Sequence, residues 1–270
     1  MDAKQILLAL SYKNQGQWES IYNDLEKKNR VTGDDYHLAE KNTKSSYFSI
    51  IDDVYPDGLK EVAKPPILLY YYGNLSLLRY RYRLTVVGSR RPTLYQNNTV
   101  YSFISECEEK LNNELVIISG MAKGIDQAGM KAAMDRNAPV ISVIGSGIDN
   151  PYPDENDGIY EYCKSGKGLI ISEYPGMLSA KPENFVMRNR ILAGLSMLTF
   201  VGAGKQRSGT VVTVRHSIDK NNEILALPCN TTGDDLTNIL IKEGATSVLT
   251  SNDLLEAIHA RYDIFSKNNS

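Results

Sequence analysis

Apolar residues recur along the chain in two patterns, which divide it near residue 65. In residues 1–65 they are spaced three and four apart, as at Leu7, Leu10, Trp18, Ile21 and Leu25. This spacing predicts short amphipathic helices. From residue 84 onward, short apolar runs rich in β-branched residues are separated by roughly 20 to 30 residues. The runs are residues 84–88, 115–119, 140–145, 169–173, 197–201, 223–228 and 247–250.

These runs lack polar alternation, so they predict strands that are apolar on both faces. Such strands, joined by helices, form a parallel sheet covered on both sides. We therefore expect a doubly wound, mostly parallel α/β domain over residues 66–270, preceded by a small helical domain over residues 1–65. Residues 67–73 add a strand that ends at a turn, and the arginines at 79, 81 and 83 alternate with tyrosines in a pattern typical of an edge strand.

Ligands of doubly wound sheets bind beyond the carboxyl ends of the strands, so the residues after each strand are candidates for a site. Small residues are frequent there: Gly88, Ser89, Ser119, Gly120, Gly124, Gly145, Gly147, Ser208 and Gly209. Their backbone N–H groups could together form an anion cradle, with support from helix N-termini. Glycine at a tight turn also has a purely structural role, and the sequence leaves both interpretations open.

The charge distribution favours an anion site. Lys and Arg total 30 against 32 acidic residues, a net charge of −2 that excludes a wholly basic nucleic-acid coat. Residues 176–218 nevertheless hold six basic residues and one acid, and Arg90 and Arg91 follow the first run without an acid nearby. Phe185 adjoins this basic segment, where it is either a core residue or a platform for stacking a base.

Signs of catalysis are sparse. The chain has three histidines but no P-loop, dinucleotide, G-x-S-x-G or H-E-x-x-H motif. Asp126 and Glu173 follow strands, where they could act as acid and base or accept loop N–H groups. Three cysteines without a C-x-x-C pair suit a reducing compartment and suggest no zinc site. We predict a cytoplasmic protein with no catalytic residue, metal, cofactor or membrane contact.

Six motifs carry a family resemblance. They are VVGSRRP (86–92), SGMAKGIDQAGMKAA (119–133), VISVIGSGIDNPYPDEN (140–156), ISEYP (171–175), NFVMRNRILAGLS (184–196) and RSGTVVT (207–213). In this order they resemble the DNA processing protein A (DprA/Smf) family, with the likeness covering roughly residues 55–258. The resemblance implies an extended Rossmann-like fold with a sterile-alpha-motif-like N-terminal domain.

The resemblance also implies a non-catalytic homodimer that binds single-stranded DNA, protects incoming DNA in natural transformation and loads the RecA recombinase. Matched motif by motif, it places these residues at the DNA: Arg90, Lys123, Lys181, Asn184, Phe185, Arg188, Asn189, Arg190, Arg207, Ser208, Gly209 and Thr210. Charge adds Arg91. Residues 235–241 depart from the family pattern, in the part implied to form the dimer.

Two other functions stay open. A phosphoribohydrolase-like enzyme on a related fold would need a glutamate after the Gly-Thr turn, where this chain has Val211, Val212 and Thr213. A nucleotide-sensing module would use the same cradle for a small ligand.

Overall fold

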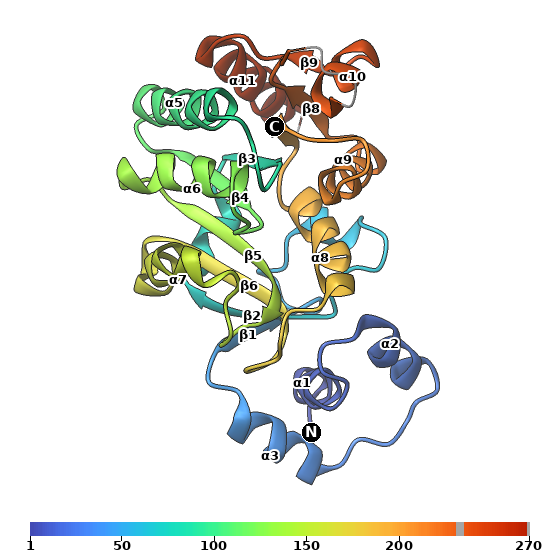
Figure 1. Cartoon of the computed structure of the whole chain (residues 1–270). Coiled ribbons are helices and arrows are strands. Elements are labelled where there is room, and N and C mark those ends of the chain that lie inside the picture. Colours follow the sequence, from blue (N-terminus) through green and yellow to red (C-terminus); the bar gives the residue numbers. More distant parts are fainter. Residues whose placement is uncertain (231–234, 269–270) are drawn as a thin grey trace.

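One sheet organises the part of the chain that the computed structural model describes, residues 1–230 and 235–268 (Figure 1). Within these residues it has nine strands in the order β1-β2-β6-β5-β4-β3-β7-β8-β9. The strands are β1 (Ser46–Ser49), β2 (Leu68–Gly73), β3 (Tyr82–Gly88), β4 (Leu115–Ser119), β5 (Val140–Gly147), β6 (Leu169–Tyr174), β7 (Leu198–Ala203), β8 (Glu223–Ala226) and β9 (Thr246–Ser247). Strands β3 to β9 are parallel, and β1 and β2 add antiparallel pairings, so the predicted mostly parallel sheet is confirmed.

The central strands are buried on both faces, as their continuous apolar runs predict. Alternate residues of β4 belong to opposite cores: Leu115 and Ile117 contact one, Val116 and Ile118 the other. The first core is covered by α5 (Leu94–Lys110), α6 (Ile125–Asp135), α7 (Asp157–Tyr162) and α11 (Ser251–Asn268). The second is covered by α4 (Asp57–Lys60), α8 (Pro182–Leu195), α9 (Gly209–Asp219) and α10 (Leu236–Lys242). The fold is therefore α/β with a doubly wound, Rossmann-like sheet (Figure 1).

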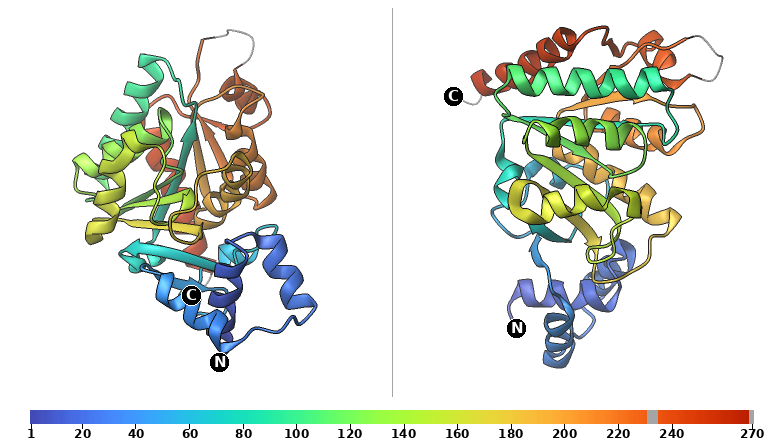
Figure 2. Two further views of the ribbon diagram at one scale, coloured as in Figure 1. Left: turned by 60° about the horizontal axis from the view of Figure 1, so that its bottom comes forward. Right: turned by 60° about the vertical axis from the view of Figure 1, so that its left-hand side comes forward.

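Three helices precede the sheet, as the apolar spacing predicts: α1 (Ala3–Lys13), α2 (Trp18–Glu26) and α3 (Gly33–Asn42). Capping boxes at Asp2 and Thr32 begin α1 and α3. Apolar residues of α1 pack on the sheet beside Tyr70 of β2, whose hydroxyl lies 3.0 Å from the Ser11 Oγ. Figure 2 shows these helices at the end of the molecule away from α11, which lies along α5.

Three local features differ from the sequence-based expectations. β1 was not predicted, and it lies at the edge of the sheet, paired with β2. The edge strand expected from the alternating arginines and tyrosines is wrong, because β3 lies between β4 and β7 and Arg83 donates to the Leu78 carbonyl. Of the run at 247–250, only Ser247 belongs to a strand, β9, and the Val248 N–H adds one bond to the Ala226 carbonyl at 3.0 Å.

The domain boundary at residue 65 stays a prediction. Residues 231–234 and 269–270 of the predicted second domain lie outside the described part of the chain. Among the described helices, none combines the length and hydropathy needed to cross a membrane.

Candidate functional site

A cleft of about 1070 Å³ opens beyond the carboxyl ends of the central strands. It lies where the chain order reverses, since β3 has β4 on one side and β7 on the other. Ligands of open α/β sheets bind at such a switch point. Its walls include Gly88, Ser89, Arg90, Arg91, Tyr152, Phe185, Arg188, Asn189, Arg207, Ser208, Gly209 and Thr210. Most of the residues predicted from the post-strand motifs thus meet in one place.

The rim of the cleft is positively charged. Arg90 and Arg91 come from the loop after β3, and Lys205 and Arg207 come from the loop after β7; all four are exposed. The Arg91 N–H is bonded to the Ser89 Oγ at 3.0 Å, which fixes the first of these turns. Charges that are far apart in the sequence therefore converge on one basic surface.

Phe185 forms part of the cleft wall rather than the core. Its half-buried ring lies 5.5 Å from the Arg90 guanidinium, 5.9 Å from that of Arg188 and 6.0 Å from the ring of Tyr152. Gly145 makes this position possible, because a Cβ there would come within 2.9 Å of the ring. The ring is thus held among cations, an arrangement that can stack a planar ligand.

Arg188 lies in the cleft but is held by the protein. It is 5% exposed, and its Nη1 donates to the carbonyls of Gly120, at 2.7 Å, and Val143. Burial lowers the pKa of its guanidinium to about 10, with the Asp126 carboxylate opposing the shift, so it remains a cation at neutral pH. A Cβ at Gly120 would lie 2.4 Å from Nη1, so this glycine leaves room for the arginine.

Arg190 does not reach the cleft, although the motif suggested that it would. It is 2% exposed, and both terminal nitrogens bond the Glu173 carboxylate at 2.7 Å. The structure thus places Arg190 outside the cleft lining, paired within the protein. The sequence left open whether Glu173 acts as an acid or base. Its carboxylate is instead engaged in the ion pair with Arg190. Asp126 likewise accepts N–H groups from Gly120 at 3.1 Å and Ala122 at 3.4 Å.

Three other predicted residues lie at or beyond the margin of the cleft. Lys123 pairs with Glu155 and borders a hollow of about 50 Å³ that adjoins the cleft beside Arg90. Lys181 is the exposed N-cap residue of α8, outside the lining. Asn184 is buried and also outside the lining.

The predicted backbone anion cradle is wrong for several of its members, because their donors are already in use. The Ser89 N–H donates to the Ala203 carbonyl at 2.9 Å, the Gly147 N–H to Leu178 at 2.8 Å, and the Gly120 N–H to Asp126.

Close packing explains the small residues at several of these turns. A Cβ at Gly88 would lie 2.7 Å from the Ile125 side chain, and one at Gly124, where φ is +78°, would lie 2.3 Å from the Ser89 oxygen. The turn before α9 differs, because Gly209 faces open space and the Ser208 hydroxyl donates to Lys205 instead of capping the helix. The N-terminus of α9 is therefore the cradle position that best fits the prediction.

Sequence reasoning missed Tyr152 as a site residue. Its side chain is 47% exposed and lines both the cleft and the adjoining hollow. An available signal was its place between two prolines just after β5, since post-strand loops carry the site in this fold. No group of three or more potential metal ligands occurs within the described residues.

Comparisons with known proteins agree on one family. The family model described as DNA recombination-mediator protein A matches residues 46–259. DNA processing protein DprA of Streptococcus pneumoniae is 39% identical over 225 residues, 82% of this chain and 77% of that protein. Protein Smf of Escherichia coli is 32% identical and covers 76% of this chain, but the match spans only 54% of the Smf length.

Two solved structures extend the likeness to the fold. S. pneumoniae DprA superposes with a TM-score of 0.77 at 31% identity, covering 93% of this chain and 95% of that one. DNA processing protein A of Helicobacter pylori, described for its single-stranded DNA binding mode, gives a TM-score of 0.71 at 25% identity, covering 81% and 98%.

Proposed function

Because the chain belongs to the DNA recombination-mediator protein A (DprA/Smf) family, we propose that it binds single-stranded DNA in the cleft without catalysing a reaction. The observation that carries this proposal is the convergence of Arg90, Arg91, Lys205 and Arg207 on one cleft whose wall includes the ring of Phe185, with Arg90 lying against that ring. Cationic side chains neutralise phosphates, and exposed aromatic faces stack unpaired bases. In a duplex those faces are covered, so this combination suits single strands.

The cleft supports binding over hydrolysis. The acidic residues lining it, among those the structure describes, are Asp126 and Asp154. Asp126 is buried, which raises the pKa of its carboxyl, and it accepts two backbone N–H groups. Small-molecule pockets typically hold about 300–1,000 Å³. The cleft volume of about 1070 Å³ lies just above that range and favours an oligonucleotide over a single mononucleotide.

Replacing Phe185 by alanine is expected to weaken binding of oligo-dT by about 1–3 kcal/mol, the contribution of one stacked base. Fluorescence anisotropy of a labelled oligo-dT measures this loss. Tyr95→Ala is the matched control, because Tyr95 is an exposed aromatic on α5 outside the cleft lining. Unchanged affinity of Phe185→Ala would show that the ring does not stack on the strand.

Replacing Arg90 by alanine is expected to make the salt dependence of binding shallower. On a single strand each phosphate contact contributes about −0.7 to the slope of log K against log salt. Folding should hardly change, because an exposed arginine contributes roughly 0–1 kcal/mol. Arg188→Ala is not equivalent, since Arg188 is buried and bonded to two carbonyls, and it should lower the melting temperature as well.

Titrations at several salt concentrations measure this slope, with Lys131→Ala on the outer helix α6 as the control. An Arg90→Ala protein that keeps the parent slope would contradict the contact.

We further propose that two copies associate through the C-terminal part of the α/β region, as the family likeness implies. Two clefts on one strand gain from effective concentration, which compensates for a short footprint. Light scattering at micromolar concentration is expected to give twice the 30.1 kDa chain mass. A monomer with full DNA affinity would contradict the dimer.

Family membership also supports the proposal that the protein acts in the cytoplasm, protects incoming DNA in natural transformation and loads the RecA recombinase on it.

A further inference from the structure

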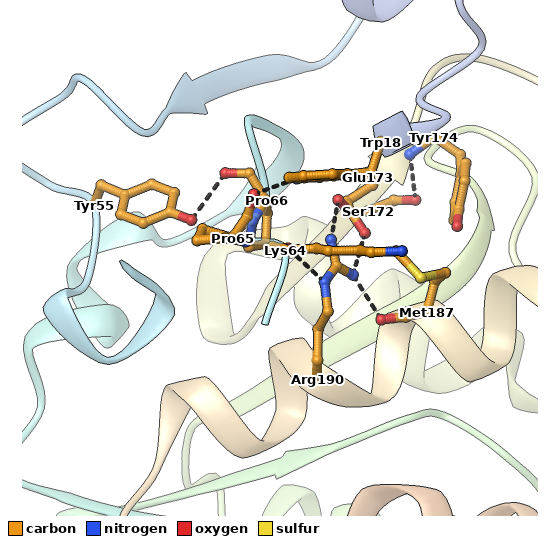
Figure 3. A network of polar contacts seen from close by, with 10 residues as sticks. All are labelled: Trp18, Tyr55, Lys64, Pro65, Pro66, Ser172, Glu173, Tyr174, Met187 and Arg190. Atoms are coloured by element: carbon orange, nitrogen blue, oxygen red, sulfur yellow. Dashed lines mark hydrogen bonds and ion pairs between the residues drawn. The ribbon is translucent and has the colours of Figure 1, made fainter. Parts of the chain in front are cut away.

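Residues 64–66, which connect α4 to β2, are bound by three side chains from separate parts of the chain (Figure 3). The Arg190 Nε donates to the Lys64 carbonyl at 2.7 Å, the Trp18 Nε1 to the Pro65 carbonyl at 2.7 Å, and the Tyr55 hydroxyl to the Pro66 carbonyl at 2.8 Å. We name residues 64–66 the junction. Helix α8 and helix α2 therefore bond adjacent peptide groups of one short segment.

The junction lies on the back of the helix that forms the cleft wall. Residues two apart on an α-helix point about 200° apart, so Arg188 faces the cleft while Arg190 faces the junction. There Arg190 also bonds Glu173 of β6 and the Met187 carbonyl (Figure 3). We call Arg190 with its partners Glu173, Met187 and Lys64 the buried node. These bonds fix the rotation of α8 about its axis, and hence the direction in which Phe185 and Arg188 point.

The turn between α1 and α2 contacts the same node. Gly16, with φ +70°, packs so closely on β6 that a Cβ would lie 2.2 Å from the backbone carbonyl oxygen of Glu173. The Gln17 amide donates to the Asn184 side chain at 3.5 Å, and Asn184 directly precedes Phe185. Lys64 pairs with Glu19 and lies 5.8 Å from the Trp18 ring.

We infer that the N-terminal helices are a positioning element for the DNA cleft: through Gly16, Gln17 and Trp18 they hold α8 in the orientation that presents Phe185 to the strand. The inference rests on the proposed function of the cleft. Coupling between two sites is reciprocal, so strand binding at Phe185 strengthens docking at Trp18, and the docking strengthens strand binding.

Trp18 reports on this coupling directly, because it is the only tryptophan of the chain and lies outside the cleft lining. Adding oligo-dT to the unmodified protein is expected to shift the Trp18 emission, excited at 295 nm, with the midpoint that anisotropy gives for strand binding. Strand binding by anisotropy without any change in Trp18 emission would overturn the inference while leaving the proposed function intact. No binding by anisotropy would overturn both.

A mutant cycle separates positioning from direct contact. Trp18→Phe removes the N–H bonded to Pro65 and is expected to weaken oligo-dT binding about 5-fold, the lower end of typical coupling. The loss should largely vanish when Phe185 is already alanine, because the orientation of α8 then matters less. Equal losses in both backgrounds would overturn the inference, since a direct contact of Trp18 with DNA does not depend on Phe185.

Tyr22→Phe is the matched control. Tyr22 stacks on Trp18 at 4.8 Å but makes none of the three hydrogen bonds to the junction, so its change should leave affinity unaltered. Gln17→Ala provides a second test that keeps Trp18 in place, and it should give the same dependence on Phe185. If neither Trp18→Phe nor Gln17→Ala lowers the affinity for oligo-dT, the inference is overturned.

Discussion

Replacing Arg190 by methionine is expected to destabilise the protein by about 3–5 kcal/mol, because the change leaves a buried carboxylate without its partner. Glu173 is 5% exposed and receives both terminal nitrogens of Arg190 at 2.7 Å. The Lys64 carbonyl also loses its donor. Urea unfolding followed by circular dichroism measures the loss.

Two controls decide whether the buried pair is the cause. Arg136→Met breaks an ion pair with Glu109 in which both side chains are exposed, and should cost at most about 1 kcal/mol. Adding Glu173→Leu to Arg190→Met should recover much of the loss, since a pair of apolar residues can replace a buried ion pair. Equal unfolding curves for Arg190→Met and the parent would contradict this account of the node.

Replacing Glu108 by glutamine is expected to stabilise the protein increasingly as the pH rises. Glu108 on α5 is fully buried, and neither carboxyl oxygen has a hydrogen-bond partner among the described residues. Burial raises the pKa of this carboxyl from 4.5 to about 9. The neighbouring thiol of Cys107 has its pKa raised to about 12, so it stays neutral.

The sign of the effect follows from proton binding. Between pH 4.5 and about 9 the folded protein keeps a proton that the unfolded chain releases. The free energy of unfolding therefore falls as the pH rises, by up to about 1.4 kcal/mol per pH unit. Glutamine removes this dependence, so the advantage of Glu108→Gln over the parent should grow between pH 5 and 8.

Urea unfolding at three pH values tests this prediction, with Glu109→Gln as the exposed neighbour. A constant difference between Glu108→Gln and the parent across that range would show that Glu108 titrates normally.

The sheet could be predicted because its signal is local. Strands β4 to β7 are runs that are apolar on both faces, and such runs have few other structures open to them. β1 escaped prediction because four residues, two of them serines, form a strand only through pairing with β2. A strand that forms only by pairing with a distant segment cannot be predicted from the residues of the strand itself.

The cleft was predicted in outline but not residue by residue. Arg90 and Arg207 were expected to meet because both follow strands, Phe185 was expected there from its motif, and all three line the cleft. Arg190 was expected at the cleft, because the sequence of α8 does not show that its ion-pair partner Glu173 lies on the opposite side of the helix. The backbone cradle was overestimated for a related reason. A glycine, which has no Cβ, makes room equally for an anion and for a protein group, and at Gly120 that group is the Arg188 guanidinium.

The central claim is that the cleft binds a strand whose bases are unpaired. Fluorescence anisotropy with one labelled oligo-dT, a duplex of equal length and unlabelled thymidine monophosphate as competitor tests it in one experiment. We predict tight binding of oligo-dT, much weaker binding of the duplex, and no displacement by the mononucleotide. Equal affinity for duplex and single strand, or displacement of the oligonucleotide by thymidine monophosphate, would contradict the account.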